Sequence, residues 1–292
     1  MGVLISVVVP TCHRNDLLAR CLDRLAPQVQ NFPSEQYEVI VTDDGSNTTA
    51  EQLIRERFPW AHWVKGPQRG PAANRNFGAS NASAPLVAFT DDDCVPDPNW
   101  LAGFAAAIRS DMEVYEGKTT SCQPYCPLTH EAPVNLAGGN LWSCNMLISV
   151  VMFRDIGGFD EAFPYANGED TDLRERLRHQ GYSIIFVSEA IIDHPAGPRK
   201  QGVAFARYVE CNVLLWYKAG HRGFVWPRVV KQVISLRLRP ILTYRPIGKP
   251  TWISFWNFII EVIYVSYNAP VWIRRYYLKY RNSLPCYEYK QF

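Results

Sequence analysis

The hydrophobic pattern of the first half of the chain alternates between short apolar runs and stretches with helical spacing. Apolar runs at 5–9, 37–42 and 86–90 have the length of buried strands, and few polar residues interrupt them. Between them, apolar positions recur at helical spacing at 17–25, and an Ala-rich stretch follows a Gly-Pro pair at 70–80. This order predicts an α/β fold with a mostly parallel, doubly wound sheet.

The pattern continues less regularly beyond residue 97. A loop rich in Pro and Cys is expected at 121–135, and turns at the paired glycines 138–139 and 157–158. The elements expected here are a helix (100–108), strands (113–117 and 145–152), a helix that ends at Gly181, and strands (183–187 and 191–193).

Acidic residues follow two of the buried strands directly. Asp43 and Asp44 end the second strand, and Asp91, Asp92 and Asp93 end the third, while Pro10-Thr11 ends the first. Ligands of doubly wound sheets bind at these carboxyl ends, so the three segments are expected to meet in one crevice. Three adjacent carboxylates repel one another unless a cation lies among them, and Mg²⁺ or Mn²⁺ prefers such ligands. The alternative is a solvated acidic turn ahead of a helix that starts at Asp97-Pro98.

Six short segments together identify a resemblance to a known family. They are Val7-Val-Val-Pro-Thr11, Val41-Thr-Asp-Asp-Gly-Ser46, Gly70-Pro-Ala-Ala-Asn-Arg-Asn76, Thr90-Asp-Asp-Asp93, Gly157-Gly-Phe-Asp-Glu161 and Gly168-Glu-Asp-Thr-Asp172. Each segment is weak alone, but their order and spacing from Ser6 to about His194 resemble family 2 of the glycosyltransferases. The resemblance implies the GT-A fold, with a Rossmann-like half that binds a nucleotide.

The resemblance also implies roles for individual residues on the donor side. Asp44 is expected to accept a hydrogen bond from the nucleotide base, and Asp93 to bind Mn²⁺ or Mg²⁺ directly. Asp91 is expected to act through ribose or water, and His194 is either a further metal ligand or a structural histidine. The residues assigned to the nucleotide sugar are Pro10, Thr11, Asp43, Asp44, Arg75, Asp91 and Asp92, and those assigned to the metal are Asp93, Asp91 and His194.

The acceptor hydroxyl needs a general base, and the resemblance places Asp170 in that role. The dipole at a helix N-terminus is expected to keep this carboxylate ionised. Glu169 is expected to order the acceptor loop, and Asp172 is a weaker candidate for the base. The alternative is that all three acids only favour the start of the helix. The residues assigned to the acceptor side are Glu169, Asp172, Gly139 and Asn145, with Gly138 beside them.

These assignments predict an enzyme that transfers a sugar from a nucleotide diphosphate sugar, UDP- or dTDP-linked, with inversion. Residues 195–230 lack the Gln-x-x-Arg-Trp motif of processive family members, so transfer of a single sugar is expected. The acceptor is expected to be a glycan or a lipid-linked molecule in polysaccharide biosynthesis. Two other classes stay open: a non-catalytic sugar-nucleotide or membrane adaptor, and a nucleotidyltransferase, which would need a Gly- and Lys-rich loop where Thr11-Cys-His-Arg-Asn stands.

Charge divides the chain into two parts. Residues 219–292 hold twelve Lys or Arg and two acids, about +10, whereas the rest holds eighteen basic and twenty-six acidic residues. We therefore predict a GT-A domain over 1–218 and a helical region over 219–292. Basic amphipathic spacing at 224–242 and an aromatic stretch at 251–273 fit an anionic membrane surface, a homodimer contact or ordinary packing on the domain. A membrane-spanning helix over 251–273 is a further alternative, although Asn257, Glu261, Asn268 and Pro270 interrupt the apolar stretch. No nucleic-acid-binding module is present.

The termini and cysteines suggest a cytoplasmic protein, peripheral on the inner face of the membrane. The apolar segment near the N-terminus is too short for a signal peptide and fits the first strand. The eight cysteines lack the spacing of a zinc site, so free thiols are expected.

Overall fold

The computed structural model describes residues 2–109, 113–221, 225–243, 248–283 and 285–287. The chain forms two compact units, the first from 1–122 with 133–195 and the second from 123–132 with 196–292. The units divide after Pro195, and not after residue 218 as predicted. The reason is that α7 (Val203–Lys218) packs along the C-terminal helix α10 and so belongs to the second unit.

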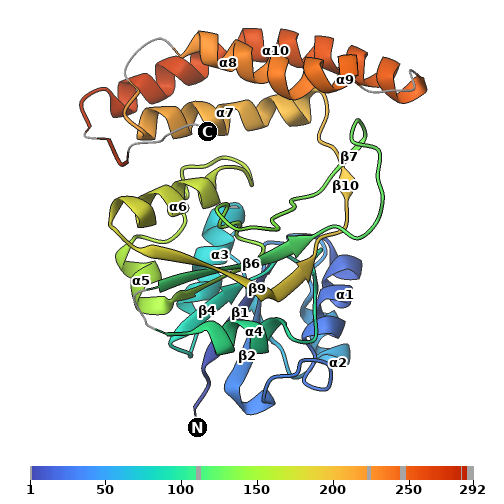
Figure 1. Ribbon diagram of the computed structural model, residues 1–292, viewed down its shortest axis with the longest axis vertical. Coiled ribbons are helices and arrows are strands. Elements are labelled where there is room, and N and C mark those ends of the chain that lie inside the picture. Colours follow the sequence, from blue (N-terminus) through green and yellow to red (C-terminus); the bar gives the residue numbers. More distant parts are fainter. Residues whose placement is uncertain (1, 110–112, 222–224, 244–247, 284, 288–292) are drawn as a thin grey trace. The chain divides into compact units, whose positions relative to one another are not determined.

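The first unit is built on an eight-stranded mixed sheet in the order β3-β2-β1-β4-β8-β6-β9-β5 (Figure 1). Its strands are β1 (Ile5–Thr11), β2 (Tyr37–Asp43), β3 (His62–Lys65), β4 (Leu86–Phe89), β5 (Val95–Pro96), β6 (Glu113–Thr120), β8 (Met146–Ser149) and β9 (Ser183–Asp193). The half formed by β3, β2, β1 and β4 is parallel, which confirms the predicted doubly wound part. In the other half, β8 runs antiparallel to β4 and β6, and β5 runs antiparallel to β9.

Helices cover both faces of this sheet (Figure 1). Val7 and Val9 of β1 point into a core with the helices of one face, whereas Val8 points into a core with those of the other, as strand alternation requires. The first face carries α1 (Asn15–Leu25), α2 (Glu51–Arg57) and α4 (Trp100–Ala107), and the second carries α3 (Pro71–Ser80), α5 (Val150–Asp155) and α6 (Glu169–His179). A short 3₁₀ helix at Ser34–Gln36 leads into β2.

The strand predicted at 145–152 is wrong in its second half. Strand β8 ends at Ser149, whose side chain accepts a hydrogen bond from the Met152 N–H and so caps the N-terminus of α5. A short apolar run has the same pattern in a buried strand and in a buried helix, and the serine was the one signal of the change.

The second unit consists of helices and a small two-stranded sheet. Its elements are β7 (His130–Glu131), β10 (Gly197–Pro198), α7, α8 (Trp226–Val233), the π-helical turn η2 (Ile234–Leu238), α9 (Arg239–Thr243) and α10 (Lys249–Tyr280). Both predicted C-terminal helices are present, although residue 224, where the first was expected to begin, lies outside the described residues. Among the helices that the structure describes, none combines the length and apolarity that a membrane crossing needs.

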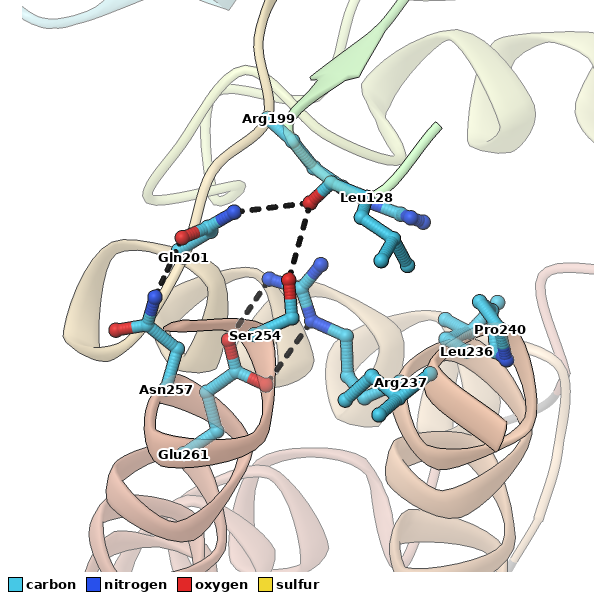
Figure 2. Close-up of a pocket in the computed structure, with 10 residues that line it drawn as sticks. Leu128, Arg199, Gln201, Leu236, Arg237, Pro240, Ser254, Asn257 and Glu261 are labelled. Atoms are coloured by element: carbon cyan, nitrogen blue, oxygen red, sulfur yellow. Dashed lines mark hydrogen bonds and ion pairs between the residues drawn. The ribbon is translucent and has the colours of Figure 1, made fainter. Parts of the chain in front are cut away.

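A buried ion pair joins the helices of the second unit (Figure 2). The Arg237 side chain, from η2, donates from Nε and Nη2 to the Glu261 carboxylate of α10, at 2.9 and 2.8 Å. Its guanidinium also lies 3.7 Å from the centre of the Phe205 ring. Glu261 accepts the Gly202 N–H at 2.9 Å as well, so the pair fixes the start of α7 to α10.

Loss of Arg237 is expected to destabilise the protein strongly. Burial lowers the pKa of Arg237 and raises the pKa of Glu261, which shows that both charges lose hydration that the pair only partly replaces. Arg237→Met leaves Glu261 as an uncompensated buried charge, a loss of about 3–5 kcal/mol in the free energy of unfolding by urea denaturation. The double change R237M/E261L should recover most of that loss. Arg239→Met, at an exposed arginine two residues further on, is the control, with a change within about 0.5 kcal/mol.

Candidate active site

The carboxyl ends of β1, β2 and β4 meet at one edge of the sheet. Thr11 is paired in register with Asp43, and the Asp44 N–H donates to the Thr11 carbonyl at 3.0 Å. On the other side of β1, the Thr90 N–H at the end of β4 donates to the Val8 carbonyl at 3.2 Å. The structure therefore brings together the three strand-end segments that the sequence singled out.

The two acids that follow β2 have different surroundings. The Asp43 carboxylate is buried and accepts hydrogen bonds from the N–H groups of Gly45 (2.8 Å) and Ala50 (2.6 Å), and from the Trp63 indole (3.2 Å). Both carboxylate oxygens are taken up by these hydrogen bonds, which fix the shape of the loop after β2. Asp44 is half-buried and accepts the Gln68 N–H at 2.8 Å, and burial raises the pKa of its carboxyl group. Asp44 is the acid of this pair that a ligand can reach.

The middle carboxylate of the triplet points into the protein. Asp92 is fully buried, and its Oδ2 accepts the Thr11 hydroxyl at 2.7 Å and the Arg14 Nε–H at 3.1 Å, while Arg14 Nη2 forms an ion pair with Oδ1. Burial raises the pKa of Asp92 to about 7 in spite of these partners. Pro10, next to Thr11, is buried as well. Asp92 and Thr11 thus hold β1 and β4 together beneath this edge of the sheet, and neither has the exposure of a ligand-contacting residue.

The outer two carboxylates bind different cationic side chains. Asp91 forms an ion pair with Arg75 Nη2 at 2.6 Å. Burial acts to raise the pKa of Asp91, but the Arg75 charge and its hydrogen bond lower it on balance. Asp93 lies 3.1 Å from Arg14 Nη1 and 3.5 Å from His194 Nε2. The two arginines therefore compensate the repulsion expected among the three acids.

The surroundings of Asp93 fit a divalent cation. Its Oδ1 atom is buried and lacks a hydrogen-bond partner among the described residues, and ligand atoms of Asp93, Cys94 and His194 lie within 4.8 Å of one another. His194 Nδ1 is 3.1 Å from the Pro195 carbonyl, and a proton donated there leaves the Nε2 lone pair available to a metal. Burial raises the pKa of the Cys94 thiol well above its usual value, so the oxygen and nitrogen donors remain, as Mn²⁺ or Mg²⁺ prefers. Asp91 is not in this group, and its carboxylate is paired with Arg75 instead.

Arg75 connects this group of acids with the start of α6. The side chain is 5% exposed, and while Nη2 binds Asp91, Nη1 lies 3.2 Å from Glu169 Oε1. Gly168 precedes α6 with φ of +91°, a conformation that favours glycine and that turns the chain into the helix at this point. Glu169 is buried with one oxygen, Oε2, lacking a hydrogen-bond partner among the described residues. The donor-side and acceptor-side acids of the sequence analysis are therefore joined through one arginine.

The predicted effect of the helix dipole on Asp170 is outweighed. Asp170 accepts the Thr171 N–H at 2.6 Å, yet burial raises the pKa of its carboxyl group above the ordinary value. The pKa of Glu169 is raised to about 7, mainly by burial and secondly by the negative charge of the neighbouring Asp170. We expected the dipole to favour the ionised form, but removal from water is the larger effect here. A raised pKa makes Asp170 a stronger proton acceptor once it has ionised.

Asp172 lies in a different environment from Asp170. It is fully buried and paired with Arg176 Nε at 2.8 Å, one turn along α6. Arg176 also donates to the carbonyls of Ile156 and Gly158, both at 2.6 Å. Asp172 therefore holds the turn at 157–161 against α6.

The residues predicted on the acceptor side include a structural one. Asn145 is buried, accepts the Trp100 indole N–H at 2.9 Å and donates to the Lys118 carbonyl at 3.0 Å, so it links strands and α4. Gly139, with φ of +97°, lies in a loop that includes Gly138 and binds the Arg174 side chain through its carbonyl at 3.0 Å.

Sequence reasoning missed two charged residues of the site. Arg14 binds both Asp92 and Asp93. The sequence offered one indication of this: Arg14 is a basic residue that follows the first strand closely, and the neighbouring strands end in acids. Glu116, 2% exposed in β6, accepts the N–H groups of Gly139, Asn140 (3.1 Å) and Leu141 (2.7 Å). An acid within a buried strand is costly unless it is paired, and that was its signal.

Two family models match consecutive parts of the chain. Residues 6–124 match the model described as "Glycosyl transferase family 2". Residues 129–195 match the one described as "N-terminal domain of galactosyltransferase". The two matches cover all of the strand-end segments and the start of α6.

Comparisons with individual proteins agree with these matches. The glycosyltransferase AglE of Haloferax volcanii is 26% identical over 210 residues, 66% of this chain and 67% of AglE. The chain spans 50–67% of the length of the first curated relatives that it matches. S. aureus TarS in complex with UDP-GlcNAc has a TM-score of 0.56 at 18% identity, covering 96% of this chain and 91% of that one. The mannosyltransferase PcManGT from Pyrobaculum calidifontis, in complex with GDP-Man and Mn²⁺, has a TM-score of 0.54 at 14% identity, covering 96% and 86%. The two structures establish the shared fold.

Proposed function

We propose that the chain, a glycosyltransferase of family 2 with the GT-A fold, transfers a single sugar with inversion from a nucleotide diphosphate sugar. The observation that carries this proposal is the bridge that Arg75 makes between Asp91 and Glu169. Through it, the acids suited to a donor lie next to the helix start that carries Asp170. An enzyme that joins two substrates needs this proximity of a leaving-group site and a base.

On the donor side, Asp44 is the reachable acid after β2 and accepts a hydrogen bond from the nucleotide base. We propose a UDP- or dTDP-linked sugar, in keeping with the UDP-GlcNAc held by the neighbour of the same fold. Asp93 and His194 would hold Mn²⁺ or Mg²⁺, which would supply positive charge beside the departing diphosphate. Arg75 and Arg14 keep the surrounding carboxylates paired.

On the acceptor side, Asp170 takes the proton of the attacking hydroxyl group. The acceptor oxygen forms a bond to the anomeric carbon while the bond from that carbon to the diphosphate breaks, so the configuration inverts. The nucleoside diphosphate leaves with the bonding electrons, and the proton stays on the Asp170 carboxyl group. Glu169 anchors the start of α6 to Arg75 and so positions Asp170. We propose a glycan or a lipid-linked molecule as acceptor, in polysaccharide biosynthesis at the cytoplasmic side.

A donor screen tests the proposal against a purely binding role. Purified protein is incubated with UDP- and dTDP-sugars and Mn²⁺, and release of the nucleoside diphosphate is measured without and with candidate acceptors. We expect release with one donor that increases at least about tenfold when a suitable acceptor is added. Binding of a nucleotide sugar with release no faster than that of the free donor would show an adaptor that kept the fold.

A further inference from the structure

One face of α10 presents large apolar side chains to solvent. Trp256 and Ile263 are each 64% exposed and Tyr267 is 82% exposed, whereas Val265 and Ala269 of the same helix are buried. At about 100° per residue, the three exposed side chains lie opposite the two buried ones. We define the α10 face by its exposed members Trp252, Trp256, Ile260, Ile263, Tyr267 and Val271. It extends for about 30 Å along the helix, more than a soluble monomer ordinarily leaves uncovered.

A second apolar surface adjoins α10 on the side of α8. A pocket of about 230 Å³ is lined almost entirely by apolar side chains, among them Val230 of α8, Ile234 at the start of η2, and Phe258 and Val262 of α10. Val230, Ile234 and Val262 are also exposed at their outer ends. The apolar surface therefore spans both helices.

Exposed cations accompany this apolar surface, and exposed carboxylates do not. Lys249 and Arg274 stand at the two ends of the α10 face, and Arg228, Lys231 and Arg239 are exposed on α8 and α9. Within the described part of 219–292 the one acid is Glu261, which is 1% exposed and paired with Arg237. The exposed charged side chains that border the apolar surface in this part of the chain are therefore all positive.

We propose that the α10 face binds the surface of an anionic phospholipid bilayer, with α10 lying in the plane of the interface. Trp and Tyr side chains favour the boundary between headgroups and acyl chains, and Lys and Arg beside them attract anionic headgroups. A second copy of the chain is a poorer occupant. A two-fold contact through this face would bring the end cations of one copy against those of the other, without carboxylates to pair them.

Vesicle binding of the full chain tests this proposal. The protein is centrifuged with phosphatidylcholine vesicles that contain either no or about one third phosphatidylglycerol. We expect binding to the anionic vesicles alone, and a blue shift of tryptophan fluorescence with it. The double change W256E/I263E should lower the partition coefficient at least about tenfold. Val151→Glu is the matched control, because Val151 of α5 is also 64% exposed and lies in the first unit.

Further measurements separate membrane binding from self-association and from misfolding. Circular dichroism and binding of a nucleoside diphosphate should be the same for W256E/I263E and wild type, which shows that the variant is folded. K249Q/R274Q, which neutralises the cations at the two ends of the α10 face, should reduce the preference for anionic vesicles. The proposal is overturned if folded W256E/I263E binds vesicles as wild type does, or if phosphatidylcholine alone binds equally well. It is also overturned if light scattering shows a dimer that W256E/I263E dissociates while vesicle binding persists.

Discussion

Asp170→Asn is expected to lower the rate of sugar transfer about 1,000-fold and to leave the affinity for the nucleotide sugar unchanged. A positioned base contributes about 10²–10⁴-fold to a proton transfer, and an amide cannot accept the proton of the acceptor hydroxyl. The amide oxygen can still accept the Thr171 N–H, so α6 should start in the same way. Single-turnover transfer and a separate titration with the donor measure the two effects. Turnover within a few-fold of wild type would remove Asp170 from the role of base.

The pH profile of the same variant distinguishes loss of a base from a distorted site. Burial raises the pKa of Asp170, and below that pKa the carboxyl group holds a proton and cannot take another, so transfer by the wild type should fall as pH falls. Glu169, with a pKa of about 7, extends the decline toward neutral pH, since its protonation weakens the pair with Arg75. The residual activity of D170N should lack the part of this decline that comes from Asp170.

Asp172→Asn is the control on the same helix. Asp172 is paired with Arg176, which donates to the Ile156 and Gly158 carbonyls. Its change should therefore lower the free energy of unfolding while the folded enzyme keeps most of its turnover. The two variants therefore separate the two acids that the sequence offered as bases. A large loss of turnover in stable D172N, with activity kept in D170N, would exchange their roles.

The strand-end acids could be predicted from the sequence because their pattern is local. Val7–Val9 and Leu86–Phe89 are short apolar runs, and each run ends at a polar segment, so both the strands and the edge where ligands bind follow from the order of residues. The individual roles of the acids depend on three-dimensional packing. Asp92 is fully buried and Asp93 is not, although the two are adjacent and chemically identical. Which way each carboxylate points is decided by Arg14, Thr11 and His194, which are distant in sequence.

The remaining differences also have physical causes outside the local pattern. The dipole of α6 was visible in the sequence, but the burial that outweighs it at Asp170 is not. The boundary between the units follows the packing of α7 on α10, and the change of composition near residue 218 does not mark it. A turn was predicted at Gly138 and Gly139, but the local pattern does not show that three N–H groups of this loop bind the buried Glu116 carboxylate.

Asp93→Asn is expected to remove the metal-dependent part of donor binding. With Mn²⁺ present, the affinity for the nucleoside diphosphate should fall about 100-fold. The asparagine amide carries no negative charge, so the metal loses the carboxylate that would bind it directly. Without Mn²⁺, wild type and variant should bind it equally weakly. Calorimetric titration measures the affinity, and electron paramagnetic resonance of Mn²⁺ measures metal binding without any turnover.

The stability of the variant should stay close to that of wild type, which makes the result interpretable. Arg14 keeps its contacts to the buried Asp92 when Asp93 becomes neutral, so an unpaired arginine is not left behind. Asp155→Asn, at an exposed acid at the end of α5, is the matched control and should bind metal and nucleotide as wild type does. His194→Ala should weaken Mn²⁺ binding by a smaller factor than D93N if its Nε2 is a ligand. Equal Mn²⁺-dependent affinity in D93N and wild type would show that the unpaired Oδ1 of Asp93 serves another purpose, and the triplet would then be an acidic turn balanced by its two arginines.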